Sequence, residues 1–125
     1  MTGVGRGLGL SIARAAVRAG RRVIGTVRGA ARAEELQGVS GEHALILVAD
    51  VTDPTAVRSA VDAATARFGR IDVLVNNAGY TLVSGVEDAS DDEIRAQFET
   101  NTFGTIDVTR AVLPGCVPRA RVGSS

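Results

Sequence analysis

The sequence predicts an α/β fold with a doubly wound parallel sheet, and the chain begins inside what should be the turn after a first strand. Short β-branched or aliphatic runs alternate along the chain with longer segments whose apolar residues recur at helical spacing. Loops rich in Gly, Asp or Asn follow the aliphatic runs. This alternation is typical of βαβ units with right-handed crossovers. The 125 residues suffice for one domain at most.

Three runs are predicted strands: residues 22–28, 44–49 and 71–75. The last two are mostly apolar, which is typical of strands buried on both faces of a parallel sheet. In the doubly wound order 3-2-1-4-5-6, the first strand is central and would precede residue 1. We therefore expect 22–28 and 44–49 to pair, and 71–75 to lie across a slot roughly 10 Å wide. Unpaired main-chain groups along such a slot predict a molten, aggregating or partner-dependent chain.

Helices are predicted between these strands. Residues 7–19 form the first, which Gly20 ends as a C-cap, and residues 29–37 supply a short crossover helix. Asp53 is an N-cap followed by Pro at the first helical position, and the helix that they begin ends at Gly69. The first helix has an apolar stripe of Leu8, Ile12, Ala15, Ala16 and Ala19, and the later one a stripe of Val57, Val61, Ala64 and Phe68.

The last helical segment begins with a capping box at residues 90–93, and we expect Ile94 and Phe98 to point inward. An irregularity is expected near residues 101–104, and the helical pattern ends at Leu113–Pro114. Residues 1–114 are thus predicted to form the domain, and residues 115–125 an irregular tail.

Composition excludes several functions. The 14 basic and 14 acidic residues cancel, so there is no overall attraction to nucleic acid or to an anionic membrane. One Cys and one His exclude a disulfide framework and the common metal sites. The chain has neither an apolar run of membrane-spanning length nor an apolar signal core at its N-terminus, so the expected location is the cytoplasm. All the basic residues are arginines, so this sequence has no lysine for Schiff-base formation or for a Tyr-Lys or Ser-Lys catalytic pair.

Glycine-rich and polar segments gather at the predicted strand ends. The loop TGVGRGLG at residues 2–9 runs directly into a helix, and backbone N–H groups at such a helix start attract phosphate. A loop that merely turns before a helix would look similar. Asp50–Val51 and the tetrapeptide NNAG at residues 76–79 follow the next two strands, and Asn101–Gly104 lies in the last helical segment. In open α/β sheets, ligands bind at the carboxyl ends of the strands.

Over residues 2–114, these motifs together closely resemble the short-chain dehydrogenase/reductase family, with its TGxxxGxG loop, its NNAG tetrapeptide and its catalytic asparagine. The resemblance implies that residues 1–114 form a partial Rossmann domain that binds NAD or NADP, truncated so that its first strand and its C-terminal half are missing. It also implies hydride exchange between nicotinamide and an alcohol or carbonyl substrate. It implies no nucleic acid, membrane or metal, and homo-oligomers for the full-length relatives. The catalytic residue that it implies is Asn101, and the cofactor-binding residues are Thr2, Gly3, Gly5, Arg6, Gly7, Leu8, Gly9, Arg28, Asp50, Val51, Asn77, Ala78 and Gly79.

One departure from the family pattern concerns catalysis. The family's acid/base is a tyrosine that is followed four residues later by a lysine, whereas Tyr80 is the only tyrosine here and Ser84 stands four residues beyond it. Ser124–Ser125 imitates the family's active-site serine, although the preceding residues are too charged for the strand that carries it. We therefore expect an inactive fragment of an oxidoreductase. The alternative is a short protein that binds a nucleotide or a partner chain without catalysis.

Two arginines bear on the choice of cofactor. NAD-specific relatives place an acidic residue at the end of their second strand, where this chain has Val27 followed by Arg28. Arg28 can pair with a 2′-phosphate through charge-assisted hydrogen bonds. Arg6 is placed like the basic residue of NADP-preferring relatives. NADP is therefore favoured over NAD, the alternative being that both arginines are simply solvated.

Overall fold

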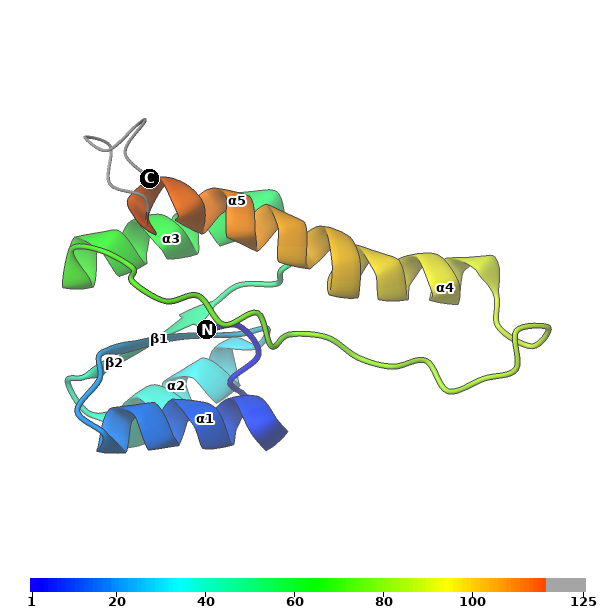
Figure 1. Ribbon diagram of the computed structural model, residues 1–125. Coiled ribbons are helices and arrows are strands. Elements are labelled where there is room, and N and C mark those ends of the chain that lie inside the picture. The colour runs from blue at the N-terminus through cyan, green and yellow to red at the C-terminus, as the bar shows by residue number, and fades with distance from the viewer. Residues whose placement is uncertain (117–125) are drawn as a thin grey trace.

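The computed structural model describes residues 1–116. A small parallel sheet lies between two layers of helices, with α1 and α2 on one face and α3 and α5 on the other (Figure 1). The elements in chain order are α1 (Gly7–Arg18), β1 (Val23–Val27), α2 (Ala30–Ser40), β2 (Ala44–Val48), α3 (Pro54–Phe68), α4 (Asp91–Phe98), the π-helix η1 (Glu99–Gly104) and α5 (Thr105–Cys116).

β1 and β2 pair in parallel, from Val23 opposite Ala44 to Val27 opposite Val48, as the sequence predicts. On the other side of β1, Thr2 forms an isolated parallel bridge with Thr26. The N–H of Thr2 also donates to the carbonyl of Val75 over 3.0 Å. The first two residues of the chain therefore lie between β1 and the segment that contains Val75.

The strand prediction for residues 71–75 is wrong, because the structure assigns no strand to them. In the described part of the chain, the neighbour available to this segment is the two-residue stretch Met1–Thr2, which is too short to form a ladder with it. The expected position is nevertheless confirmed, since residues 71–75 lie across a gap from β1.

The helix α1 packs through a different face from the one predicted. Leu8 is 69% exposed and Ile12 is exposed, whereas Gly9 and Ala13 are buried against the sheet. Small residues occupy this face because α1 approaches the chain near Gly3 too closely for larger side chains. Gly20 follows the end of α1 with a positive φ, as predicted.

The predicted boundaries of α3 are confirmed. The Asp53 carboxylate accepts hydrogen bonds from the N–H groups of Thr55 and Ala56, and Gly69 ends the helix. Val57 and Ala64 of the predicted stripe are buried. Val57 packs near α5, where it forms a core with Val51, Val108 and Val112. The shorter crossover helix α2 runs three residues beyond its predicted end, to Ser40.

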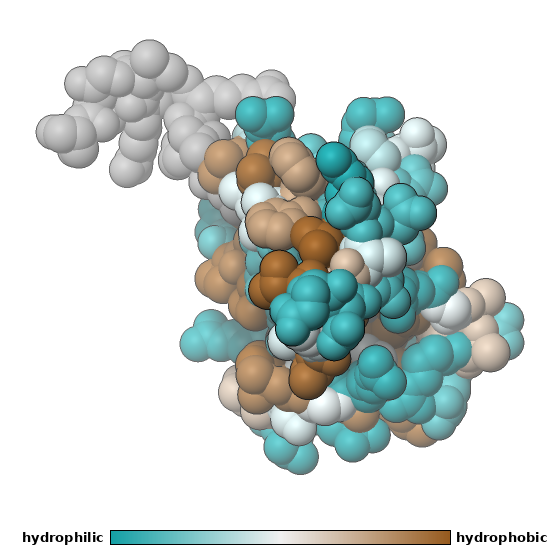
Figure 2. Space-filling model, turned by 90° about the vertical axis from the view of Figure 1, so that its right-hand side faces the viewer, coloured by the Kyte–Doolittle hydropathy of each residue, from teal (hydrophilic) through white to brown (hydrophobic). Residues whose placement is uncertain are grey.

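The helix α4 begins with the predicted capping box, in which the hydroxyl of Ser90 accepts from the N–H of Glu93 and the Glu93 carboxylate accepts from the N–H of Ser90. Phe98, predicted to point inward, is instead 57% exposed. The reason is that α4 extends away from the sheet (Figure 1), which leaves its apolar side chains without a core to enter. Apolar surface is visible among hydrophilic groups at this end of the molecule (Figure 2).

The predicted irregularity is confirmed as the π-helix η1, which joins α4 to α5. α5 continues through Pro114 to Cys116, two residues into the predicted tail. The rest of that tail, including Ser124–Ser125, lies outside the described residues. Within residues 1–116, no helix is both long and apolar enough to cross a membrane.

Candidate cofactor site

The glycine-rich loop connects the bridge at Thr2 to the start of α1. Arg6 is the N-cap residue of α1, and within the described chain its side chain caps no N–H of the helix. The first turn also lacks an acidic residue. The first N–H groups of α1 are therefore left to a ligand or to water, and the helix dipole makes this end attractive to an anion.

Two glycines give this loop its shape. A Cβ on Gly9 would stand 2.1 Å from the carbonyl oxygen of Gly3 and 2.4 Å from Nδ2 of Asn77, so only hydrogen fits there. Gly7 has a φ of 58° and open space beyond its Cα. Gly9 thus permits close packing inside the fold, and Gly7 leaves room for a ligand on the outer side of the loop. This arrangement suits a phosphate-bearing cofactor.

The loop is held by the segment that carries NNAG. Oγ1 of Thr2, a buried residue, accepts hydrogen bonds from the N–H groups of Asn77 (3.1 Å) and Ala78 (3.0 Å). Nδ2 of Asn77 donates to the carbonyl of Gly3 over 3.0 Å. Residues more than 70 positions apart in sequence are thereby fixed to one another, so Thr2 and Asn77 position the loop.

Arg28 and Asp50 follow the ends of β1 and β2. One carboxylate oxygen of Asp50 accepts from the N–H of Thr52 (2.9 Å) and from its hydroxyl (2.8 Å). The backbone hydrogen bond from Thr52 is the main cause of the lowered pKa of Asp50; partial burial opposes it, and the Thr52 hydroxyl and the charge of Arg28 lower it further. Asp50 is therefore a fixed carboxylate, whereas the side chains of Arg28 and Arg6 are exposed to solvent.

Arg32 is a site residue that the sequence analysis missed. Its Nε donates to the carbonyl of Gly5 over 2.8 Å, and its NH1 pairs with Glu35 at 2.7 Å. It therefore braces the glycine-rich loop from α2. The sequence contains a signal for this role: Arg32 lies in the first turn of α2, where the helix dipole disfavours a cation, so an arginine there indicates a compensating contact.

Asn101 lies in η1 and binds the loop that follows NNAG. Its Oδ1 accepts from the N–H of Tyr80 (2.9 Å), and its Nδ2 donates to the carbonyl of Tyr80 (2.6 Å). A Cβ on Gly79 would stand 2.9 Å from the same Oδ1, so this contact needs glycine. A π-helical turn re-aims side chains and is frequent at functional sites. The structure therefore connects Asn101 with Gly79 and Tyr80.

Val51 serves packing. It is buried, and a Cβ on Gly104 would stand 2.7 Å from its Cγ2. This contact joins the loop after β2 to η1. Ala78 packs against the same cluster as Val51, and Asn77 binds Thr2 and Gly3, so the structure brings together the three predicted segments at residues 2–9, 50–51 and 76–79. Among the described residues there is no group of His, Cys, Asp or Glu side chains that could hold a metal ion.

Comparison with known proteins is consistent with this geometry. The family model described as short chain dehydrogenase matches residues 1–124. The chain is 45% identical over 115 residues to Oxidoreductase BOA17 of Botryotinia fuckeliana, covering 91% of the chain and 42% of that relative. It is 39% identical over 122 residues to the NADP-dependent 3-hydroxy acid dehydrogenase YdfG of Salmonella typhi, covering 97% of the chain and 49% of that relative.

Solved structures give the same result. A short-chain dehydrogenase from Streptomyces avermitilis superimposes with a TM-score of 0.85 at 42% identity, covering 91% of this chain and 42% of that one. A 3-ketoacyl-(acyl-carrier-protein) reductase from Brucella melitensis, solved in complex with NADH, superimposes with a TM-score of 0.86 at 34% identity, covering 91% and 48%. The chain thus spans less than half the length of these relatives.

Proposed function

Because the chain belongs to the short-chain dehydrogenase family, we propose that it forms the dinucleotide-binding part of an NADP-dependent oxidoreductase acting on an alcohol or carbonyl compound. The observation that carries this proposal is the glycine-rich loop, whose helix start offers uncapped N–H groups beside the open side of Gly7. When bound, the nicotinamide would accept or donate the hydride.

The residues divide between binding and support. Gly7 and Leu8, at the start of α1, are proposed to bind the pyrophosphate through their N–H groups. Asp50 is proposed to lie near the adenine ring, where the hydrogen bonds from Thr52 hold its carboxylate in one orientation. Thr2 and Asn77 act as supports, because their hydrogen bonds fix the loop against the NNAG segment.

A preference for NADP is proposed from Arg28. The side chain is exposed at the end of β1, where a guanidinium is free to bind a 2′-phosphate in a bidentate manner. No acidic residue follows β1 to hold the ribose hydroxyls of NAD. Of the relatives, YdfG is named as NADP-dependent and the Brucella reductase was solved with NADH, so the family accommodates both cofactors.

The 125-residue chain itself is proposed to bind cofactor weakly and to lack turnover. It contains no lysine, and its single tyrosine, Tyr80, has its main chain bound to Asn101 in the loop after NNAG. Asn101 can hold this loop in place, but an amide cannot remove the hydroxyl proton during alcohol oxidation. For the whole protein we propose a small alcohol or carbonyl substrate, a homo-oligomeric state and a cytoplasmic location.

A second candidate function is a short protein that binds a nucleotide or a partner chain without catalysis. The described site supports it, because the uncapped N–H groups of α1 and the open side of Gly7 suit binding of a nucleotide and need no general base. The genomic sequence on either side separates the two proposals. An aliphatic strand encoded upstream and a Tyr-x-x-x-Lys encoded downstream would support the oxidoreductase.

The test is a comparison of NADPH and NADH affinities by titration calorimetry. NADPH should bind the unaltered chain more tightly, and Arg28→Asp should reverse the order, because one charged hydrogen-bonding contact corresponds to about a tenfold change in affinity. Arg58→Asp, on the exposed side of α3, has the same charge change and should leave the order unaltered. The same preference in the unaltered chain and in Arg28→Asp would refute the role of Arg28.

A further inference from the structure

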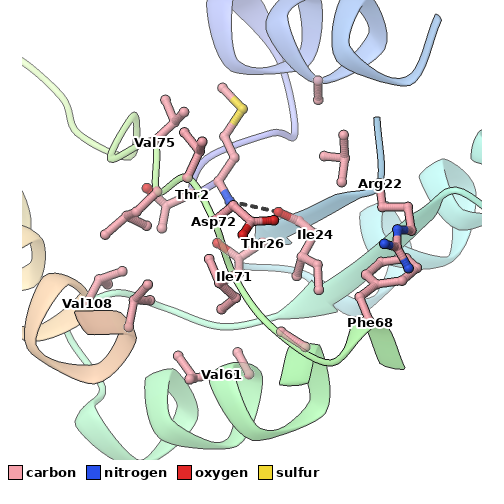
Figure 3. A pocket seen from close by; sticks show the side chains of 18 of the residues that line it. Thr2, Arg22, Ile24, Thr26, Val61, Phe68, Ile71, Asp72, Val75 and Val108 are labelled. Atoms are coloured by element: carbon pink, nitrogen blue, oxygen red, sulfur yellow. Dashed lines mark hydrogen bonds between the residues drawn. The ribbon is translucent and has the colours of Figure 1, made fainter. Parts of the chain in front are cut away.

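The outer edge of β2 lies on the opposite side of the sheet from the cavity of about 780 Å³ between β1 and residues 70–75 (Figure 3). On its inner side β2 pairs with β1, and the N–H of Ala49, just after β2, donates to a carbonyl of β1 over 2.9 Å. Because successive residues of a strand turn their N–H and C=O groups to opposite sides, those of Ala44, Ile46 and Val48 face away from β1. In the described part of the chain, no other strand pairs with this side.

Gln37 of α2 binds this outer edge through its carboxamide. Its Nε2 donates to the carbonyl of Ala44 over 2.9 Å, and its Oε1 accepts from the N–H of Ile46 over 2.8 Å. In a parallel sheet, a residue of the neighbouring strand bonds in the same way to the residues one before and one after its partner. The side chain of Gln37 therefore takes the place of one peptide unit of a parallel neighbour.

The packing of α2 holds Gln37 at this position. Leu36 is 3% exposed and Ala33 is buried, and both belong to the core cluster against which Ile46 packs. Gln37 itself is half-buried. A long polar side chain loses rotamer freedom when it is held in one conformation, and the two hydrogen bonds offset that loss. The buried face of α2 thus carries the carboxamide to the edge of β2.

The residues of β2 would make an open edge prone to pairing. Ala44–Val48 reads ALILV, without a charge, a proline or a glycine. Aliphatic segments of this kind pair with copies of themselves when their main-chain groups are free. Val48, at the end of the strand, is 50% exposed. A second copy of the same strand is therefore the partner that best matches this edge.

From these contacts we propose that Gln37 blocks the addition of a second copy of the β2 strand to the outer edge of β2. Any added strand would need the carbonyl of Ala44 and the N–H of Ile46, and the carboxamide already binds both. Covering an edge is one of the ways in which proteins prevent such pairing. The proposal is independent of the cofactor, because this edge lies outside the site at the glycine-rich loop.

The test is Gln37→Leu, which removes both hydrogen bonds and keeps a residue that favours a helix. Amide exchange at Ile46 should become faster by about tenfold or more, since a bonded N–H exchanges only on opening. Exchange at Ala49, whose N–H is bonded to β1, should be unaltered. Self-association, followed by sedimentation velocity, should begin at about tenfold lower concentration than in the unaltered chain. The cavity beside β1 is common to both chains, so its contribution cancels.

Two matched variants test the cause of these changes. Glu34→Leu adds the same leucine on the exposed side of α2, and it should alter neither the exchange at Ile46 nor the self-association. Gln37→Glu keeps an oxygen that accepts from the N–H of Ile46, and its charge disfavours strand pairing. Exchange at Ile46 should therefore stay slow in Gln37→Glu, and self-association should stay as low as in the unaltered chain.

Should Gln37→Leu fail to fold, Gln37→Asn replaces it. Its carboxamide is one methylene shorter and should not reach both main-chain groups, so the same two changes are expected. Unaltered exchange at Ile46, or exchange that becomes equally faster at Ala49, would overturn the proposal. So would a Gln37→Leu chain that associates no more readily than the unaltered chain or than Glu34→Leu.

Discussion

Replacing Gly9 with alanine should destabilise the fold and disrupt the cofactor loop together. The added Cβ would stand 2.1 Å from the carbonyl oxygen of Gly3, a main-chain atom that moves only with the whole loop. It would also stand 2.4 Å from Nδ2 of Asn77, which donates to that same carbonyl. Overpacking of this kind costs about 1–3 kcal/mol, and the loss of the Asn77 hydrogen bond adds about 1 kcal/mol. We therefore expect a loss of about 2–4 kcal/mol in the free energy of unfolding.

The assay is urea unfolding followed by far-UV circular dichroism, with NADPH titration of the same samples. Gly38→Ala is the matched control, because Gly38 lies inside α2 with nothing near its Cα and alanine should stabilise it by about 0.5–1 kcal/mol. Gly9→Ala should lower the urea midpoint and weaken NADPH binding, whereas Gly38→Ala should raise the midpoint and leave binding unaltered. A Gly9→Ala chain as stable as the unaltered one would refute the close packing described here.

Three further predictions address charge, turnover and folding. Thr52→Val removes one hydrogen bond to Asp50 and should raise the pKa of that carboxyl, as measured by carbon NMR. The pKa of Asp50 is lower in the folded chain than in the unfolded chain. The stability that Asp50 contributes is therefore present above its unfolded pKa and is lost as the pH falls through its folded pKa. The 125-residue chain should show no NADP-dependent alcohol oxidation, since a general base contributes about 10²–10⁴-fold in rate, and robust turnover would contradict this. The cavity between β1 and residues 70–75 leaves sheet edges open, so the chain should be prone to aggregate or depend on a partner; light scattering should rise with its concentration, and a monomer at every concentration would show that it is not.

Local sequence signals predicted most helix boundaries well. Asp53, Ser90 and Gly69 act within one turn of their own position, so their roles do not depend on distant parts of the chain. The parallel pairing of β1 with β2 also followed from the alternation of strands and helices. The cofactor loop was predictable from the local sequence, because its glycines and the start of α1 are adjacent along the chain.

Features that depend on tertiary packing were not predictable from local patterns. Leu8 and Phe98 have helical spacing that suits a core, but α1 packs through Gly9 instead and α4 extends beyond the sheet. Residues 71–75 have the composition of a strand, yet a ladder requires a neighbour of similar length. The position of Arg32 in the first turn of α2 was a local signal, but its partner, the carbonyl of Gly5, lies 27 positions away and was not predictable. Each case depends on what lies opposite the segment in space.

The most direct test of the cofactor site is an NMR titration of the ¹⁵N-labelled chain with NADPH. The proposed site predicts that the amide signals of Gly7, Leu8 and Gly9 shift first and furthest, because their N–H groups begin α1 beside the open side of the loop. NADH should require higher concentrations to produce the same shifts. Shifts confined to other parts of the chain, or no shift at millimolar NADPH, would contradict the assignment of this loop as the dinucleotide-binding site.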